Sequence, residues 1–275
     1  MKDKVVIITG ASSGIGKALA FECARRGAKL SLGARDGEKL RMISEEITVK
    51  SEKFAYSGCG VMVVNTDVTK EADCKNLIVK TIERYGRIDV LINNAGISMR
   101  ALFEDVDLKV LHQVMDTNFW GMVYCSKYAL PYLLTARGSL VGISSVAGFK
   151  GLPGRTGYSA SKFAMHGFLD CARMENMKKG LHVLLACPGF TASNIRNLSL
   201  SKDGKPQEET PLDESKLMSA EEVAKHICHA IEKRKRTLVL TTQGKMTVFL
   251  NKFFPSFMDK MVYNHMAKEP DSPFK

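Results

Sequence analysis

The stretch that decides the fold lies near the start of the chain and reads Val5-Val6-Ile7-Ile8-Thr9-Gly10-Ala11-Ser12-Ser13-Gly14-Ile15-Gly16. A short β-branched run is followed by a turn with three glycines, and then by a helix-like segment from Ile15 to Arg26. Glycines let such a turn approach a pyrophosphate closely, and the helix N-terminus offers free N–H groups and a positive dipole end. A glycine-rich turn without a ligand could have the same spacing, but the position in a first strand–turn–helix unit favours a dinucleotide site.

Working outward from this unit, apolar runs alternate with helix-like stretches along most of the 275 residues. The predicted strands are Val5–Ile8, Lys29–Ala34, Val61–Asn65, Ile88–Ile92, Ser139–Ser144, His182–Ala186 and Thr237–Leu240. The predicted helices are Ile15–Arg26, Gly37–Lys50, Glu71–Tyr85, Val106–Thr135, Tyr158–Lys178 and Ala220–Lys233. Such alternation predicts an α/β fold, a doubly wound parallel sheet of about seven strands covered on both faces.

No internal repeat or linker divides the first 244 residues, so we predict one Rossmann-type domain over residues 1–244. A long stretch without periodicity at about 190–218 is expected to be a substrate lid. Residues 245–275 form a C-terminal extension with apolar residues at helical spacing, interrupted at Pro255, which predicts two amphipathic helices. These helices could pack on the domain or on a partner subunit. Because lysines flank them, they could also lie on a membrane surface.

The composition excludes several classes of protein. Hydrophobic residues make up 45% and charged residues 25%, which is globular and not disordered. The seven cysteines include no CxxC pair and indicate reduced thiols. No signal peptide or transmembrane segment is evident, so we expect a cytoplasmic protein, with peripheral membrane contact left open. The net charge of +11 is compatible with an anionic cofactor. We expect no metal site at His226 and His229, and no nucleic-acid binding.

Arg35 follows the second predicted strand, at the position where an acidic residue would bind the ribose 2′-OH of NAD. Ala34 is neutral, and Arg35 is a fixed cation whose donors suit a 2′-phosphate. This pattern favours NADP(H) over NAD(H). Asp36 weakens the positive field, and Arg35 could also be a solvated arginine at a strand end.

Together with further motifs, these residues resemble the short-chain dehydrogenase/reductase superfamily from Lys4 to about Leu240. The motifs are Asp67-Val68, Asn93-Asn94-Ala95-Gly96, Asn118, Ser145 after Ser144, Tyr158-Ser159-Ala160-Ser161-Lys162, and Pro188-Gly189 followed by Thr191. A lone YxxxK has little meaning, but five motifs in the family's order and spacing are specific. The C-terminal part resembles the dehydrogenase/reductase member 7B group, which is related to the 11β-hydroxysteroid and 3-ketosphinganine reductases.

The resemblance implies both a cofactor site and a catalytic set. The expected cofactor-binding residues are Gly10, Ser12, Ser13, Gly14, Ile15, Gly16, Arg35, Asp67, Val68, Asn94, Ala95, Gly96, Tyr158, Lys162, Pro188, Gly189 and Thr191. The expected catalytic residues are Asn118, Ser145, Tyr158 and Lys162. One departure from the family is Ser13, where many NADPH-preferring members carry a basic residue, so the preference for NADPH depends mainly on Arg35.

Tyr158 and Lys162 are i and i+4 on one predicted helix, so their side chains share a face. Carbonyl reduction requires a hydride at carbon and a proton at oxygen. A free tyrosine has a pKa near 10, which a cationic Lys162 would lower. Ser145 would bind the substrate oxygen, and Asn118 would hold a water that links Lys162 to solvent.

The predicted substrate pocket contains Val146, Phe149, Leu152 and Phe190, although these could be ordinary core residues. No buried acid or arginine is evident near them, which favours a neutral, apolar substrate such as a steroid, lipid or xenobiotic ketone or aldehyde. We therefore expect an NADPH-dependent carbonyl reductase, assembled as a homodimer or homotetramer. The alternatives are a catalytically quiet NADP(H)-binding regulator and a membrane-surface protein.

Overall fold

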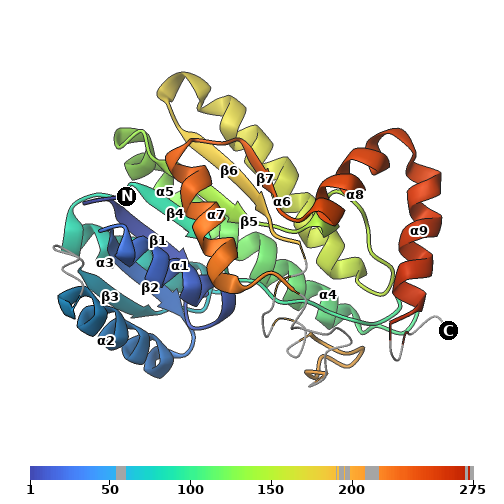
Figure 1. The fold of residues 1–275 in the computed structure, drawn as a ribbon. Helices are drawn as coiled ribbons and strands as arrows, with labels where there is room; N and C mark the ends of the chain where they lie inside the picture. Colours follow the sequence, from blue (N-terminus) through green and yellow to red (C-terminus); the bar gives the residue numbers. More distant parts are fainter. Residues whose placement is uncertain are drawn as a thin grey trace.

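The predicted strands form one parallel sheet in the computed structural model (Figure 1). The structure describes residues 1–53, 60–189, 191, 195, 199–207, 217–269 and 272. The strand order is β3-β2-β1-β4-β5-β6-β7. The strands are β1 Val5–Thr9, β2 Lys29–Ala34, β3 Val61–Asn65, β4 Val90–Asn93, β5 Ser139–Ile143, β6 His182–Cys187 and β7 Thr237–Val239. The doubly wound α/β fold is confirmed.

Helices cover both faces of the sheet. One face carries α1 Gly14–Arg25, α2 Gly37–Lys53 and α7 Ala220–Glu232. The other carries α3 Glu71–Tyr85, α5 Gly121–Thr135 and α6 Thr156–Glu175. Ile8 faces the first group and Ile7 the second, and both side chains are fully buried. The central strands are therefore buried on both faces, which explains why their sequences are continuous apolar runs.

The predicted helix Val106–Thr135 is divided in the structure. It consists of α4 Leu108–Met115, a π-helical segment Asp116–Trp120 (η1) and α5. A π-helical segment inserts an extra residue into the helical ladder, and such segments often occur at functional sites. This one carries Asn118. The sequence prediction assigned residues 106–135 to one continuous helix and did not place this segment.

α6 also begins earlier than predicted, at Thr156 instead of Tyr158. Tyr158 is therefore the third residue of the helix and lies in its first turn. Before α6, a short 3₁₀ turn, η2 Val146–Gly148, follows β5 and Ser145.

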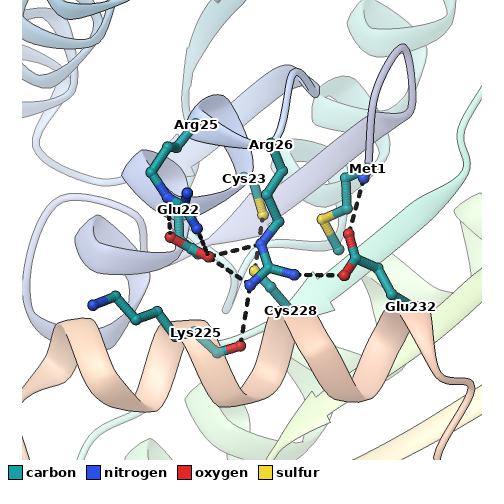
Figure 2. A network of polar contacts seen from close by, with 8 residues as sticks. All are labelled: Met1, Glu22, Cys23, Arg25, Arg26, Lys225, Cys228 and Glu232. Atoms are coloured by element: carbon teal, nitrogen blue, oxygen red, sulfur yellow. Dashed lines mark hydrogen bonds and ion pairs between the residues drawn. The ribbon is translucent and has the colours of Figure 1, made fainter.

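α1 is held against α7 by an ionic and thiol network (Figure 2). Glu22 is 6% exposed, and Arg25 and Arg26 both donate hydrogen bonds to its carboxylate. Burial opposes ionisation of Glu22, but the two arginines lower its pKa. Arg26 also pairs with Glu232 at the end of α7. The helix that follows the glycine turn is thus fixed from its C-terminal end.

The C-terminal extension contains the two helices that the sequence predicts, α8 Thr242–Phe253 and α9 Pro255–Ala267. They extend beyond the sheet and lie over the loop before α6 (Figure 1). Asn251 of α8 donates to the carbonyl oxygen of Phe149 at 2.9 Å, and Lys150 forms an ion pair with Asp259 of α9. No helix in the described part of the chain has the length and apolar character needed to cross a bilayer.

The predicted lid at about 190–218 falls mostly outside the described residues. Its described part includes Leu200, which forms an isolated β-bridge with Met99 and accepts a hydrogen bond from the backbone of Arg100 at 2.9 Å. This contact places residues 199–207 beside the segment that follows β4. The lid and the domain boundary at residue 244 stay predictions.

Candidate active site

The motif residues converge at the carboxyl ends of β1, β4, β5 and β6, where the order of the strands reverses around β1 and β4. Ligands of doubly wound sheets bind in the crevice outside this edge. The glycine turn follows β1, the Asn93–Gly96 motif follows β4, Ser145 follows β5 and Pro188-Gly189 follows β6.

The glycine turn has no room for a side chain at Gly10 or at Gly16. Gly10 has a φ of +65°, and a Cβ there would lie 2.8 Å from Cα of Ala95. A Cβ on Gly16 would lie 2.2 Å from the carbonyl oxygen of Gly10. Asn94 clamps the turn, since its Nδ2 donates to the carbonyl oxygens of Thr9 at 2.9 Å and Gly10 at 3.1 Å. Asn94 therefore holds the backbone of the turn in place.

The N-terminus of α1 is left open for an anion. Its N-cap residue, Ser13, makes no side-chain cap hydrogen bond, and the first turn contains no acidic residue. Ser12, Gly14 and Ile15 are only half-buried. Free N–H groups, a positive dipole end and glycines at positions 10, 14 and 16 fit a pyrophosphate.

Arg35 is exposed directly after β2, and among the described residues it has no hydrogen-bond or ion-pair partner. The neighbouring Asp36 is engaged elsewhere. It accepts a hydrogen bond from the backbone of Lys39 at 3.0 Å and forms an ion pair with the Lys39 ammonium at 3.0 Å. The backbone N–H of Lys39, followed by its side chain, lowers the pKa of Asp36. Asp36 thus directs its charge toward α2, which leaves the Arg35 guanidinium available.

Asp67 and Val68 lie after β3. The Asp67 carboxylate accepts hydrogen bonds from the backbone and the hydroxyl of Thr69, at 3.1 and 2.8 Å. Val68 is 7% exposed and packs against Gly121, where a Cβ would lie 2.8 Å from that of Val68. Both positions are fixed by contacts that orient the loop toward the strand ends.

Asn118 ties the π-helical segment to two parts of the site. Its Oδ1 accepts from the backbone N–H of Ile97 at 2.8 Å, and its Nδ2 donates to the Ile97 carbonyl oxygen at 2.9 Å. The same Nδ2 donates to Oγ of Ser161 at 2.9 Å, and Ser161 donates to the carbonyl oxygen of Tyr158 at 2.7 Å. Asn118 therefore links the segment after β4 to the first turn of α6.

Lys162 is 4% exposed. Its Nζ donates to the carbonyl oxygen of Ile143 at 3.0 Å and lies 5.6 Å from the centre of the Tyr158 ring. Burial lowers the pKa of Lys162 to about 8. A Cβ on Gly96 would lie 3.6 Å from Nζ and 3.2 Å from Oδ1 of Asn118. The structure thus brings together the tyrosine, the lysine and the asparagine.

Ser145 lies at the start of η2, where its Oγ accepts a hydrogen bond from the backbone N–H of Ala147 at 3.1 Å. The preceding Ser144 is hydrogen-bonded through Oγ to Nε2 of His166 at 2.8 Å. Burial, followed by the nearby Lys162, lowers the pKa of His166 to about 4. A neutral imidazole therefore fixes the segment that carries Ser145.

Sequence reasoning missed several supporting residues. Thr9 accepts hydrogen bonds through Oγ1 from the backbones of Asn94 and Ala95 at 3.0 and 3.1 Å. Ser161 and His166 also hold the site. His166 follows Lys162 by four residues, so the i, i+4, i+8 series starting at Tyr158 is a signal that could have identified it.

The described residues of the expected substrate pocket each contact a different part of the structure. A Cβ on Gly244 of α8 would be 3.1 Å from Cγ2 of Val146. Phe149 packs edge-on against His166, with ring centres 4.6 Å apart. Leu152 donates its backbone N–H to Oγ of Ser159 at 3.1 Å. A cavity of about 420 Å³ beside α6 and α8 is lined by Phe149, His166, Leu169, Leu185, Val239 and Val248 among others. Phe190 lies outside the described residues, and the substrate pocket stays a prediction.

The turn after β6 contacts the start of α8. Pro188 is buried, and a Cβ on Gly189 would lie 2.6 Å from Oγ1 of Thr241. Thr191 is 5% exposed and donates through Oγ1 to the carbonyl oxygen of Gly189 at 3.1 Å. The proposed cofactor residues at this end are therefore packed against Thr241, the N-cap residue of α8.

Comparison with known proteins identifies the class. The family model described as short chain dehydrogenase matches residues 4–203. An 11-beta-hydroxysteroid dehydrogenase A from Sesamum indicum is 32% identical over 277 residues, which cover 98% of this chain and 78% of the relative. A dehydrogenase/reductase SDR family member 7B from Danio rerio is 34% identical over 279 residues, covering 98% of this chain and 87% of the relative.

Solved structures agree in fold. An alcohol dehydrogenase from the archaeon Thermococcus sibiricus, complexed with 5-hydroxy-NADP, superimposes with a TM-score of 0.74 at 25% identity, covering 87% of this chain and 96% of that one. A short-chain dehydrogenase/reductase from Burkholderia phymatum, in complex with NAD, gives a TM-score of 0.81 at 24% identity, covering 93% and 95%. The second likeness shows the fold alone.

The chain belongs to the short-chain dehydrogenase/reductase family. It is a NAD(P)-dependent oxidoreductase, and its resemblance to the member 7B and 11β-hydroxysteroid dehydrogenase group is confirmed. The open N-terminus of α1 and the glycine turn, which is tightly packed at Gly10 and Gly16, fit the nicotinamide cofactor that this class uses.

Proposed function

We propose that this oxidoreductase uses NADPH to reduce the carbonyl group of an apolar substrate, with Tyr158 as the general acid. The observation that carries the proposal is the buried Lys162. Its Nζ lies 5.6 Å from the Tyr158 ring centre, and its pKa of about 8 keeps it mostly protonated at neutral pH. A cation so close to a phenol stabilises the tyrosinate form.

The chain's own residues would divide the work as follows. Bound NADPH would supply the hydride for the carbonyl carbon. Ser145 would donate a hydrogen bond to the carbonyl oxygen, and Tyr158 would deliver the proton to that oxygen. Lys162 would stabilise the charge left on Tyr158, and Asn118 would hold a water that passes a proton back from solvent. The Ser144–His166 hydrogen bond supports the placement of Ser145.

A panel of carbonyl substrates tests this proposal. We expect NADPH oxidation with steroids, long-chain keto lipids, retinal-like aldehydes or quinones, and a loss of about 10²- to 10⁴-fold in kcat in Tyr158→Phe. NADPH binding, followed by its fluorescence, should be retained in that variant. Tight NADPH binding without turnover of any carbonyl would contradict the proposal and favour a regulatory cofactor-binding protein.

Arg35 supports the preference for NADPH, since its guanidinium is exposed and Asp36 is engaged by Lys39. A charge-assisted contact with the 2′-phosphate is worth about 1.5–3 kcal/mol. Arg35→Ala should therefore lower the NADPH/NADH ratio of kcat/KM by about ten- to a hundredfold. Arg41→Ala, a nearby exposed arginine on α2, is the matched control and should leave the ratio unchanged. If wild type and Arg35→Ala had the same NADPH/NADH ratio of kcat/KM, Arg35 would not be the residue that binds the 2′-phosphate.

The C-terminal extension supports a second property, peripheral contact with a membrane surface. Phe249, Phe253, Phe254 and Phe257 are each 55–61% exposed, and lysines accompany them on α8 and α9. Exposed aromatic side chains beside basic residues favour an anionic lipid interface. The full chain should float with anionic vesicles, and a Phe249→Ser/Phe253→Ser/Phe257→Ser variant should not. Equal flotation of both proteins would contradict this role.

A homodimer or homotetramer stays part of the proposal, because relatives of this class commonly assemble. Light scattering of the purified chain would measure its mass directly, and a monomer at micromolar concentration would reject the proposed assembly.

A further inference from the structure

The helix that carries Tyr158 begins without the usual stabilising groups. The N-cap residue of α6 is Arg155, which makes no side-chain cap hydrogen bond, and the first turn contains no acidic residue. A cation at a helix N-terminus faces the positive end of the helix dipole, which is unfavourable. Tyr158 lies in this first turn, and the ends of helices fray more readily than their interiors.

The missing negative charge comes from the far end of the chain. Glu269, just after α9, accepts hydrogen bonds from Nη2 of Arg155 at 3.2 and 3.1 Å. The same carboxylate lies 3.4 Å from Nη2 of Arg100, in the segment after β4. The three side chains are 5–14% exposed, so water screens their interaction only weakly. One carboxylate thus forms ion pairs with a guanidinium from each of two segments.

Movement of Arg155 would be transmitted directly to the first turn of α6. The carbonyl oxygen of Arg155 accepts the first helical hydrogen bond, from the backbone of Ser159 at 2.8 Å. Arg155 also forms an isolated β-bridge with Ala101, next to Arg100. Met266 of α9 lies 3.9 Å from the Arg155 guanidinium, measured from its sulfur. The end of α9, the segment after β4 and the start of α6 therefore meet at one residue.

We propose that Glu269 is a positioning residue for Tyr158. By neutralising Arg155, it lets the first turn of α6 stay closed and makes the C-terminal extension part of the catalytic unit. The pair Lys150–Asp259 also connects α9 to the loop before α6, but Asp259 is 69% exposed and lies away from the helix start. The consequence for turnover rests on the proposed function, whereas the closure of the turn does not.

Hydrogen exchange of the full chain tests the closure directly. In Glu269→Gln, we expect the amides of Ser159 and Ala160 to exchange about tenfold faster. A partly buried charge at a helix N-terminus changes the stability of the first turn by about this factor. Amides of α1 should be unchanged. Asp259→Asn removes the ion pair of the same helix with Lys150. Because the Asp259 side chain is 69% exposed, the exchange of α6 should stay within about twofold of wild type.

Activity provides the second measurement. Glu269→Gln should lower kcat by about tenfold, while the Kd for NADPH remains unchanged because Asn94 holds the glycine turn independently of α6. If Glu269 only anchored the C-terminal tail, Glu269→Gln could lower kcat and speed the exchange of α6 in the same way. A second variant, which restores a negative charge at the start of α6, separates the two roles.

Thr156 is exposed and is the first residue of α6, so Thr156→Asp places an acid in the turn itself. In the Glu269→Gln/Thr156→Asp double variant, slow exchange and kcat should both be restored to within about threefold of wild type. Fast exchange in the double variant, or unchanged exchange in Glu269→Gln, would overturn the proposal. A chain without turnover on any carbonyl would reject the proposed function alone, because the exchange result still decides the role of Glu269.

Discussion

The first turns of α1 and α6 are alike in one respect and opposite in another. Both lie at the site, both have an N-cap residue without a side-chain hydrogen bond, and both lack an acidic residue in the first turn. α1 follows Ser13 and the glycine turn, and no described side chain caps its N-terminus. α6 follows Arg155, which is paired with Glu269 from 114 residues further along the chain.

The difference shows that one local feature can serve two purposes. At α1 the uncompensated dipole is available to a cofactor phosphate that arrives from solvent. At α6 the protein supplies its own carboxylate, Glu269, which we propose holds the turn that carries Tyr158 whether or not a ligand is bound. Changes that fill the first turn or add charge to it should therefore act differently at the two helices.

The largest effect should come from closing the space in the glycine turn. Gly16→Ala places a Cβ 2.2 Å from the Gly10 carbonyl oxygen and 2.5 Å from Nδ2 of Asn94, a clash that backbone atoms cannot relieve without opening the turn. We expect the Kd for NADPH to rise more than about a hundredfold, measured by fluorescence titration. Gly167→Ala on α6, where the structure leaves open space, is the control. Normal NADPH binding by Gly16→Ala would show that the turn is not the phosphate site.

The next largest effect is a pH dependence that should differ between catalysis at α6 and NADPH binding at α1. Because the pKa of Lys162 is about 8, the ammonium loses its proton as the pH rises through that value, and its support for tyrosinate is lost. The kcat of the reductase should fall about fiftyfold between pH 8 and pH 10, while NADPH binding at α1 changes little. A kcat that stays constant up to pH 10 would show that the protonated form of Lys162 is not required for the chemical step.

A smaller effect is expected from an acid at α1. Ser13→Asp improves the N-cap of the helix but places a negative charge where the cofactor phosphate would bind. The melting temperature of the free protein should therefore rise slightly, while the Kd for NADPH increases about tenfold. Ser13→Asn is the uncharged control. Should both variants bind NADPH equally well, electrostatics at this terminus would be unimportant.

The smallest effect should come from the same change at α6. Thr156→Asp alone adds a charge to a turn that Glu269 already neutralises, so stability should rise by only about 0.3–1 kcal/mol, and NADPH binding should not change. Chemical denaturation would measure the gain, with Thr156→Asn as the control. A destabilised protein would show that an acid is not tolerated beside Arg155.

Much of this comparison was readable from the sequence. The strand Val5–Ile8, the three glycines and the order of the motifs predicted the sheet and the cofactor end, because a strand and its following turn are local features. The break at Pro255 also predicted the two C-terminal helices, since proline cannot continue a helix. The π-helical segment at Asn118 was not predicted, because both flanking segments are helical and their apolar residues were assigned to one continuous helix.

The sequence by itself determined the fold class, the family, the glycine turn and the i, i+4 pairing of Tyr158 with Lys162, since each depends on residues close together along the chain. Only the tertiary structure decided that Asp36 turns to Lys39, that His166 holds Ser144 and that Glu269 neutralises Arg155. The last two contacts join separate elements. The strength of the Glu269 contact depends on a burial that no local pattern encodes.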